Sequence, residues 1–352
     1  MKKHCLFALV TIMLFLFTLP ISTATPYWAK PGVYIEYTAK RYNPYIESQV
    51  NRGIKPELVT TASLLYFRNG TYYWVDCHND TLIKFKILTE RGEYLTMGVL
   101  LNLKNVTIKF EAQNGTQISA FWNSADVIST SKRVLADGKV SVKVKLRSLR
   151  IFGEYRIRKK DGMVFGMNGT PYGHTFIWME NVSPNITLVT FPMYNWSATV
   201  KSVSPDNQRG LITYYGLFQP PIVTVAVIGP PFKIPGKIEF TTVTPDSLRY
   251  DPSTGLVLNI GSVGVALVPD LAAIGIPFAS FTDEYYQFKV QNEQENNYLY
   301  PTGLVFYDTN AEFQKVQEIP FSKARTIWKY VFWTSIVFLS FVVLKRSFGW
   351  PK

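Results

Sequence analysis

Short segments in which apolar and polar residues alternate recur through the middle of the chain, and this alternation limits what the chain can fold into. In residues 104–110, Val106, Ile108 and Phe110 alternate with polar residues, which is the period of a β-strand with one buried face. Asn69-Gly70 separates two such segments and is typical of a two-residue hairpin turn. Many short strands with regular turns predict an all-β ectodomain, either an antiparallel sandwich or a barrel, as one or two domains.

Residues 1–24 have the pattern of a signal peptide. Lys2 and Lys3 precede an uncharged apolar run over 5–19, and small residues at 22–24 supply a cleavage site. An uncleaved N-terminal anchor is the alternative, although the run is shorter than the roughly 20 residues that a membrane-spanning helix needs.

Residues 327–344 predict one transmembrane helix. They contain a single charged residue, Lys329, and the basic pair that begins at Lys345 follows them. We therefore expect a cytoplasmic tail at 345–352, and a buried core helix is the alternative. Together with the signal peptide, this predicts a single-pass protein of the cell membrane with residues 25–322 outside.

Cysteine content excludes a disulfide-stabilised fold for the mature chain. Cys5 belongs to the expected signal peptide, so Cys77 is left without an intrachain partner and the core must hold the fold. The polar stretch 203–210 is the expected linker between a glycosylated β domain at 25–202 and a membrane-proximal β domain at 211–322. One continuous β fold is the alternative.

The chain carries eight matches to the N-glycosylation pattern Asn-X-Ser/Thr, where random placement would give about two or three. The expected acceptors are Asn69, Asn79, Asn105, Asn114, Asn168, Asn181, Asn185 and Asn195. None lies in residues 201–322, although that half contains six asparagines. Because glycans obstruct close contact, we expect this bare half to make the principal contact with the membrane, a partner or a second copy.

The formal net charge of +12 is concentrated near the two ends and in residues 132–161, which contain eleven Lys and Arg but only three acidic residues. In this stretch basic and apolar residues alternate, with a change of phase and an expected bulge near Ser148. Such a face suits an anionic polysaccharide, a phospholipid or another anionic surface, and nucleic acid is not the expected partner. A solvated face that blocks edge-to-edge strand pairing is the alternative. The five expected patch residues are Lys143, Lys145, Arg147, Arg156 and Arg158.

The sequence lacks the common catalytic and nucleotide-binding motifs: H-E-x-x-H, G-x-S-x-G, the P-loop and G-x-G-x-x-G are all absent. Cys77 and His78 are adjacent, and adjacent residues of a strand point to opposite faces, so a free thiol beside a loop imidazole is favoured over a catalytic pair. A serine triad with His174 stays open, since nothing in the sequence locates its members.

Two acidic pairs, Asp76 with Asp80 and Asp283 with Glu284, could hold a cation, and solvated turn residues are the favoured interpretation. With two histidines and one cysteine in the mature chain, most zinc sites are disfavoured. We therefore expect no catalytic, cofactor or metal site.

Two segments, Leu211–Ile228 and Ile260–Phe281, are unusually apolar. Asp270 is the only charge of the second segment, and its two prolines argue against a spanning helix. A buried strand and loop is one interpretation. The other is an exposed apolar surface that faces a membrane or a partner.

The expected signal peptide is followed at residues 27–34 by Tyr-Trp-Ala-Lys-Pro-Gly-Val-Tyr, and the chain closes with an aromatic-rich anchor and a short tail. In this layout the chain resembles the uncharacterised membrane-anchored surface proteins of hyperthermophilic archaea and their viruses, a resemblance that implies no particular activity. The favoured function is a non-enzymatic membrane-anchored surface glycoprotein that binds or scaffolds envelope components. The alternatives are a viral or envelope glycoprotein that acts on membranes through an apolar region, and a secreted hydrolase with an unrecognised site.

Overall fold

The computed structural model describes residues 25–42, 59–113, 120–180, 182–234, 238–240, 247–261, 267–285 and 298–313. The expected signal peptide, transmembrane helix and cytoplasmic tail lie outside these residues, as do two of the expected glycan acceptors, Asn114 and Asn181. Over the described ranges, no helix reaches the length and hydropathy that a membrane crossing requires.

The described chain is all-β, as expected, with one short α-helix, α3 (Pro269–Ala272), and two 3₁₀ turns, η2 (Ser124–Asp126) and η3 (Pro192–Tyr194). The strands are β1 (Tyr34–Ala39), β2 (Ala62–Arg68), β3 (Thr71–Cys77), β4 (Thr81–Arg91), β5 (Tyr94–Gln113), β6 (Val127–Val134), β7 (Lys139–Arg158), β8 (Met163–Gly166), β9 (Pro171–His174), β10 (Thr187–Phe191), β11 (Trp196–Asp206), β12 (Gly210–Ile212), β13 (Leu217–Phe218), β14 (Ile222–Ile228), β15 (Phe232–Ile234), β16 (Ile238–Phe240), β17 (Ser247–Tyr250), β18 (Val257–Gly261), β19 (Phe278–Phe281), β20 (Tyr298–Leu299) and β21 (Leu304–Thr309).

Twelve of these strands close into an antiparallel barrel, so the structure decides between the two expected architectures. Their order is β5-β4-β1-β21-β18-β17-β14-β11-β10-β9-β8-β7, and β7 pairs with β5 to complete the ring. The barrel takes strands from both sides of the expected linker, and residues 203–206 are the end of β11. The stretch 203–210 therefore does not separate two cores.

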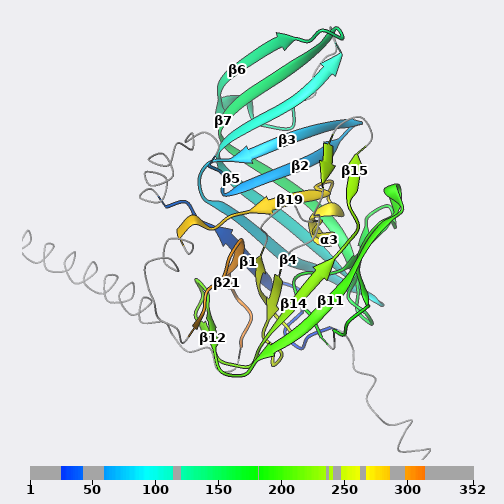
Figure 1. Ribbon diagram of the computed structural model, residues 1–352, viewed down its shortest axis with the longest axis vertical. Coiled ribbons are helices and arrows are strands. Elements are labelled where there is room, and N and C mark those ends of the chain that lie inside the picture. Colours follow the sequence, from blue (N-terminus) through cyan, green and yellow to red (C-terminus); the bar gives the residue numbers. More distant parts are fainter. Residues whose placement is uncertain are drawn as a thin grey trace, which may run out of the picture.

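A second sheet, called here the outer sheet, continues from the barrel. Its order is β19-β2-β3-β5-β7-β6, and it forms the upper part of the molecule in Figure 1, above the barrel strands. β5 and β7 belong to both sheets because each is 20 residues long. β4 pairs with the first half of β5, up to Leu103, and β3 pairs with the second half, from Val106 onward.

The ladder between β5 and β7 runs without a register shift from Tyr94 opposite Arg158 to Gln113 opposite Lys139. Its buried side nevertheless changes, from odd-numbered residues such as Leu103 in the barrel to even-numbered ones such as Val106 in the outer sheet. The change of phase expected near Ser148 is therefore present, but without a bulge in this ladder. The left-handed residue lies on the other strand, at Asn105, whose φ is 52°.

The segment 27–34 leads into β1 and packs on the core through its buried tryptophan. Trp28 is buried, its indole Nε1 donates a hydrogen bond to the carbonyl of Thr254 at 2.7 Å, and its ring packs edge-on against Trp178 and Phe313. The backbone then joins β4, since Gly32 N–H donates to the Ile87 carbonyl at 2.8 Å. Within residues 27–34, Trp28 and Ala29 are thus core residues, whereas Tyr27 and residues 30–32 are exposed.

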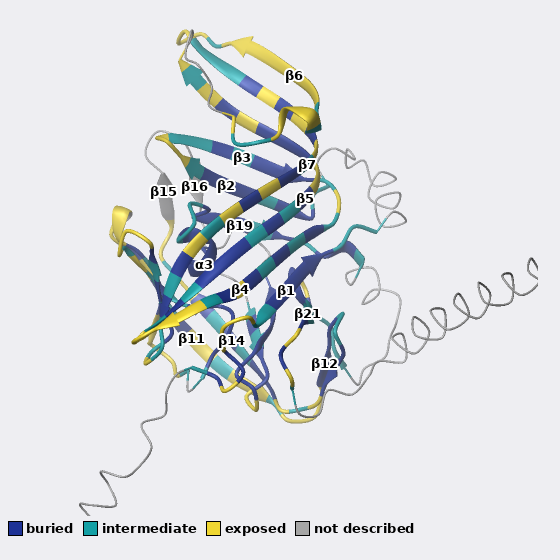
Figure 2. Ribbon diagram, turned by 180° about the vertical axis from the view of Figure 1, so that it is seen from behind, coloured by how far each residue is buried: buried dark blue, intermediate teal, exposed yellow. Residues whose placement is uncertain are grey.

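The two apolar segments are also part of the core. All four residues of α3 are buried, and the views of Figures 1 and 2 both place α3 beside β19, where the barrel meets the outer sheet. Ile274 packs against β7 at Gly153, where an added Cβ would lie 2.5 Å from the Ile274 Cβ. In Leu211–Ile228, the apolar strand residues are buried except Ala226, which is half-buried, and Ile228, which is exposed. Over their described residues, which exclude 262–266, both segments are mainly buried, and this favours the interpretation as buried strand and loop.

The left-handed backbone at Asn105 predicts an unusual order of stabilities. Asn105→Ala should have a free energy of unfolding about 1 kcal/mol lower than Asn105→Gly, because a Cβ is strained at positive φ. Both changes remove the glycan acceptor, so loss of a sugar cancels in the comparison. Urea unfolding followed by tryptophan fluorescence measures the difference. Asn79 is the control, because its φ is not positive: there the glycine variant should be less stable than the alanine variant. Equal stability of the two Asn105 variants would contradict the expectation.

Candidate functional site

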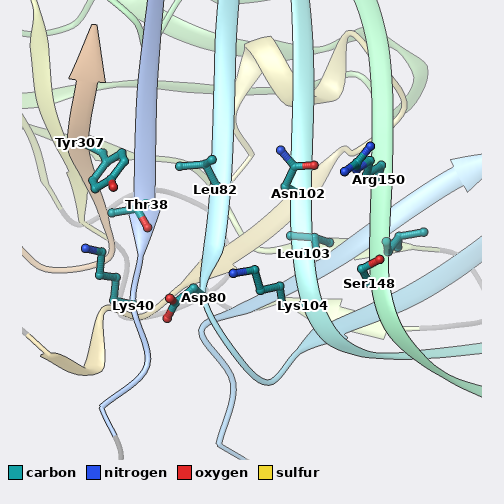
Figure 3. A pocket seen from close by; sticks show the side chains of 11 residues that line it. Thr38, Lys40, Asp80, Leu82, Asn102, Leu103, Lys104, Ser148, Arg150 and Tyr307 are labelled. Carbon is teal, nitrogen blue, oxygen red and sulfur yellow. The ribbon is translucent and has the colours of Figure 1, made fainter. Parts of the chain in front are cut away.

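A hollow of about 380 Å³ lies on the outer face of the barrel, close to where the outer sheet begins. The strand register forms this hollow. One row of paired residues crosses four neighbouring strands: Thr38 of β1, Leu82 of β4, Asn102 of β5 and Arg150 of β7. Two residues further along the strands, the same face reaches the outer-sheet end of the hollow. There the lining residues are Lys40, Asp80, Lys104 and Ser148. We call this hollow the basic groove, and Figure 3 shows its side chains.

The basic groove carries three cations and one carboxylate, Asp80. Lys104 and Arg150 are exposed, and neither forms an ion pair with a residue of the described ranges. The Lys40 ammonium lies 4.1 Å and 4.9 Å from the ring centroids of Tyr214 and Tyr307, which hold it by cation–π attraction. An anion entering the groove would therefore meet unneutralised positive charge.

The acidic pair Asp283 and Glu284 anchors the Lys40 end of the basic groove. The Asp283 carboxylate accepts the Lys40 N–H at 2.8 Å and the Tyr214 hydroxyl at 2.9 Å, and Glu284 accepts the Tyr42 N–H at 3.2 Å. Both acids are buried, and burial raises the pKa of Glu284 despite the hydrogen bond and the charge of Arg41 nearby. Their interpretation as solvated turn residues is wrong, because each carboxylate satisfies groups of the chain leaving β1.

The other acidic pair is divided between two roles. Asp76 is buried in the outer sheet, where it accepts hydrogen bonds from Ser63 and Trp74 and pairs with Lys109 at 2.8 Å. Asp80 accepts the backbone N–H of Arg41 at 3.0 Å and lines the basic groove. Asp76 is thus not a solvated turn residue, and in the described part of the chain no three His, Cys or acidic side chains gather as a metal site would require.

The five expected patch residues do not form one patch. Lys143, Lys145 and Arg147 are exposed along the outer half of β7, whereas Arg156 and Arg158 lie on the barrel half. The Arg158 guanidinium binds Asp161 through Nε and Nη2, at 2.6 Å for the shortest contact, which raises the pKa of Arg158. Figure 2 shows exposed and buried residues alternating along β7, which is not an edge strand because β6 lies beyond it. Blocking of an exposed edge therefore does not account for Lys143 and Lys145.

Lys104 could not be predicted as a groove residue from the alternation of basic and apolar residues in β7, because it belongs to another strand. It stands on β5, opposite Ser148, and only the register of the β5–β7 ladder brings it to Arg150. An exposed aromatic ring adjoins them: Phe152 is two residues from Arg150 on the same face and is 62% exposed. The opposite residue on β5 is Leu100. The outer face of β5 and β7, called here the outer wall, thus combines the cations Lys104 and Arg150 with an apolar strip formed by Phe152 and Leu100.

The Cys77–His78 pair is not arranged as a nucleophile and base. The Cys77 thiol is buried and lies 3.1 Å and 3.2 Å from the carbonyl oxygens of Asn79 and Lys104. The His78 ring contacts the Val59 carbonyl at 3.2 Å instead. His174 contacts the Thr175 carbonyl at 2.8 Å, and burial lowers the pKa of its ring. These contacts fit the interpretation of Cys77 and His78 as a free thiol and a loop imidazole.

A buried carboxyl group, Asp270 of α3, lies in the core beside the barrel wall. It accepts the hydroxyls of Tyr155 at 2.6 Å and Thr175 at 2.7 Å, and the N–H of Phe176 at 2.7 Å. Full burial raises the pKa of Asp270, because desolvation of the carboxylate outweighs these three hydrogen bonds. The group satisfies neighbouring polar groups and holds α3 against β7.

The six described glycan acceptors are all exposed: Asn69, Asn79, Asn105, Asn168, Asn185 and Asn195. Four of them also hold the only positive φ values among non-glycine residues of the described ranges, namely Asn69, Asn105, Asn185 and Asn195. Asparagine adopts this backbone conformation more readily than most residues. These positions therefore suit asparagine for conformational reasons as well as for a sugar.

In comparisons with protein-family models, curated proteins and solved structures, nothing matches this chain. Its function is therefore inferred from the residues of the groove and from the layout of the sequence.

The raised pKa of Asp270 predicts a pH dependence of stability. Because the native pKa lies above the unfolded value, the contribution of Asp270 is complete below the unfolded pKa and is lost as the pH rises through the native pKa. The stability of the native chain relative to Asp270→Asn should thus fall by up to about 1.4 kcal/mol per pH unit above pH ~4. Urea unfolding at a series of pH values measures it. Asp137→Asn is the control of opposite sign, since Lys139 lowers the pKa of Asp137; a flat difference for Asp270 would contradict the expectation.

Proposed function

We propose that this protein is a non-enzymatic, membrane-anchored surface glycoprotein whose barrel binds an acidic polysaccharide of the envelope through the basic groove. The observation that carries the proposal is the pair of exposed cations, Lys104 and Arg150, that have no ion-pair partner in the described ranges and line a hollow beside Phe152. The signal peptide, the acceptor asparagines and the C-terminal anchor expected from the sequence support placement at the cell surface.

The chemistry of the wall favours an acidic sugar chain over other anions. Carboxylate or sulfate groups would pair with Lys104 and Arg150, while the C–H face of a sugar ring would cover the exposed Phe152 ring. Asn102 and Ser148 add neutral groups that can hydrogen-bond to hydroxyls. A phosphate or a small carboxylate would use the cations alone and leave the apolar strip exposed.

The alternatives have less support. Action on membranes through an apolar region requires that region to be accessible, and the described parts of both apolar segments are mainly buried. A hydrolase of the cysteine or serine type requires its nucleophile and a histidine base in reach of one another, and Cys77, His78 and His174 each contact backbone carbonyls instead.

The groove cations should determine binding of an acidic polysaccharide. The double variant Lys104→Ser, Arg150→Ser should bind polygalacturonate at least about fivefold more weakly, which is about 1 kcal/mol. Isothermal titration or fluorescence anisotropy with dye-labelled polymer measures the affinity. The matched control is Lys86→Ser, Lys132→Ser, which removes two exposed cations elsewhere and lowers the net charge equally. An equal loss of affinity for polygalacturonate in both double variants would show that binding depends only on net charge, and it would contradict the proposal.

Phe152 should contribute in a different way. Phe152→Ala should weaken polygalacturonate binding without altering its dependence on salt, because an apolar contact releases no counterions, whereas the Lys104 and Arg150 changes should flatten that dependence. Titrations at low and high salt separate the two effects. An unchanged affinity of Phe152→Ala would remove the sugar-face contact from the proposal.

Surface anchoring is tested on intact cells. Protease added outside should digest residues 25–322 and spare the anchor, and glycopeptide mass spectrometry should find several acceptor asparagines occupied. A chain that is fully protected from protease, or one that carries no sugar at any acceptor, would overturn the surface assignment.

A further inference from the structure

Two of the expected glycan acceptors stand at the outer-sheet end of the basic groove. Asn79 precedes Asp80, and Asn105 follows Lys104; both of these neighbours line the groove. The two acceptors are joined through the backbone, since the His78 N–H donates to the Asn105 carbonyl at 2.9 Å. They meet at this point because β4 leaves β5 at Leu103 and β3 joins it at Val106, so the β3–β4 turn fits into the gap.

Asn105 also stands within the row of exposed cations. Lys104 lies opposite Ser148 and Val106 opposite Leu146, which sets Asn105 across from Arg147. Residues opposite one another in an antiparallel pair have Cβ atoms about 5 Å apart. A sugar on Asn105 would therefore rise beside Arg147, between the basic groove and the exposed Lys145 and Lys143.

The backbone holds both acceptors in place. Asn105 has a left-handed φ of 52° within the longest ladder of the described strands, and the Asn79 side-chain oxygen accepts the Asp80 N–H at 2.8 Å. Both side chains are exposed, so a glycan would project outward from the wall. Lys104, Arg147 and Arg150 would then lie close to the attachment points of two bulky glycans.

We infer that glycans on Asn79 and Asn105 restrict the basic groove to a single anionic polysaccharide chain and exclude flat anionic surfaces such as a bilayer. Attraction between exposed charges is screened over about 8 Å at physiological ionic strength, so a surface held off by carbohydrate gains little from these cations. A slender chain can pass between the two glycans and reach them. This inference rests on the proposed function of the groove and adds the shape of the ligand that it accepts.

The test compares one soluble chain with one surface. The full chain, made in a host that glycosylates it, is reconstituted into phosphatidylcholine vesicles and mixed with dye-labelled polygalacturonate or with dye-labelled phosphatidylglycerol vesicles. Thr107→Val removes the acceptor at Asn105 without changing Asn105 itself, and Asn79→Gln removes the other. The matched control, Thr71→Val with Thr170→Val, deletes the acceptors at Asn69 and Asn168, which are in turns away from the groove. Glycopeptide mass spectrometry establishes occupancy.

The wild-type chain should capture phosphatidylglycerol vesicles at least about tenfold less well than the double variant at Asn79 and Asn105, with both chains binding polygalacturonate within about threefold of each other. The control variant should behave as the wild type. Equal vesicle capture by wild type and double variant, an equal gain in the control, or unoccupied Asn79 and Asn105 would overturn the inference.

Failure of the proposed function gives a different result. A chain that gains vesicle capture when the two glycans are lost, but binds no polygalacturonate in either form, would refute the polysaccharide ligand and retain the exclusion by glycans. If the double variant does not fold, endoglycosidase treatment of the folded wild-type chain supplies the same comparison, and unchanged vesicle capture after treatment would again overturn the inference.

Discussion

The long antiparallel ladder between β5 and β7 is the interaction on which the rest of this structure depends. Each strand donates and accepts along 20 residues in one register, so the two cannot slide relative to one another without losing every pair. In the barrel half the ladder closes a ring of twelve strands, and in the outer half it is the middle of a second sheet. The barrel and the outer sheet therefore share one rigid support.

The ladder buries one side in the barrel and the other side in the outer sheet, and this change of side explains Asn105. Leu103 and Val106 are both buried although they are three positions apart, and a regular strand would place residues at that spacing on opposite faces. One residue in left-handed conformation allows the change at low cost when that residue is asparagine. The same change of side separates β3 from β4, and the hollow that we describe as the basic groove lies close to that separation.

Buried polar groups attach the loops to the β5–β7 ladder and its neighbouring strands. No disulfide does so in the described chain, because its one cysteine, Cys77, is free. Asp283 and Glu284 fix the chain that leaves β1, and Asp270 fixes α3 against Tyr155 of β7. A carboxyl group is costly to bury, and several hydrogen bonds converge on Asp270 and on Asp283. None of these acids pairs with Lys104 or Arg150, which have no ion-pair partner among the described residues, and these two cations make the groove a binding surface in our proposal.

By itself, the sequence determined the class of fold and several of its local features. Alternation at Val106, Ile108 and Phe110 and the turn at Asn69-Gly70 depend only on the chain's own period and conformational preference, and both are present as strands and a hairpin. The exposure of Lys143 and Lys145 follows from the same alternation.

Only the tertiary structure decided which strands meet and therefore where a site lies. The expected linker became the end of β11, and the acids interpreted as solvated turn residues became buried anchors, because burial depends on what packs against a residue and not on its type. Lys104 and Arg150 are 46 positions apart in the chain, and nothing in either segment specifies the register that brings them to one groove. Pairing between distant strands is set by the packing of the whole core, so the site that we propose is a property of the closed barrel and not of any single segment.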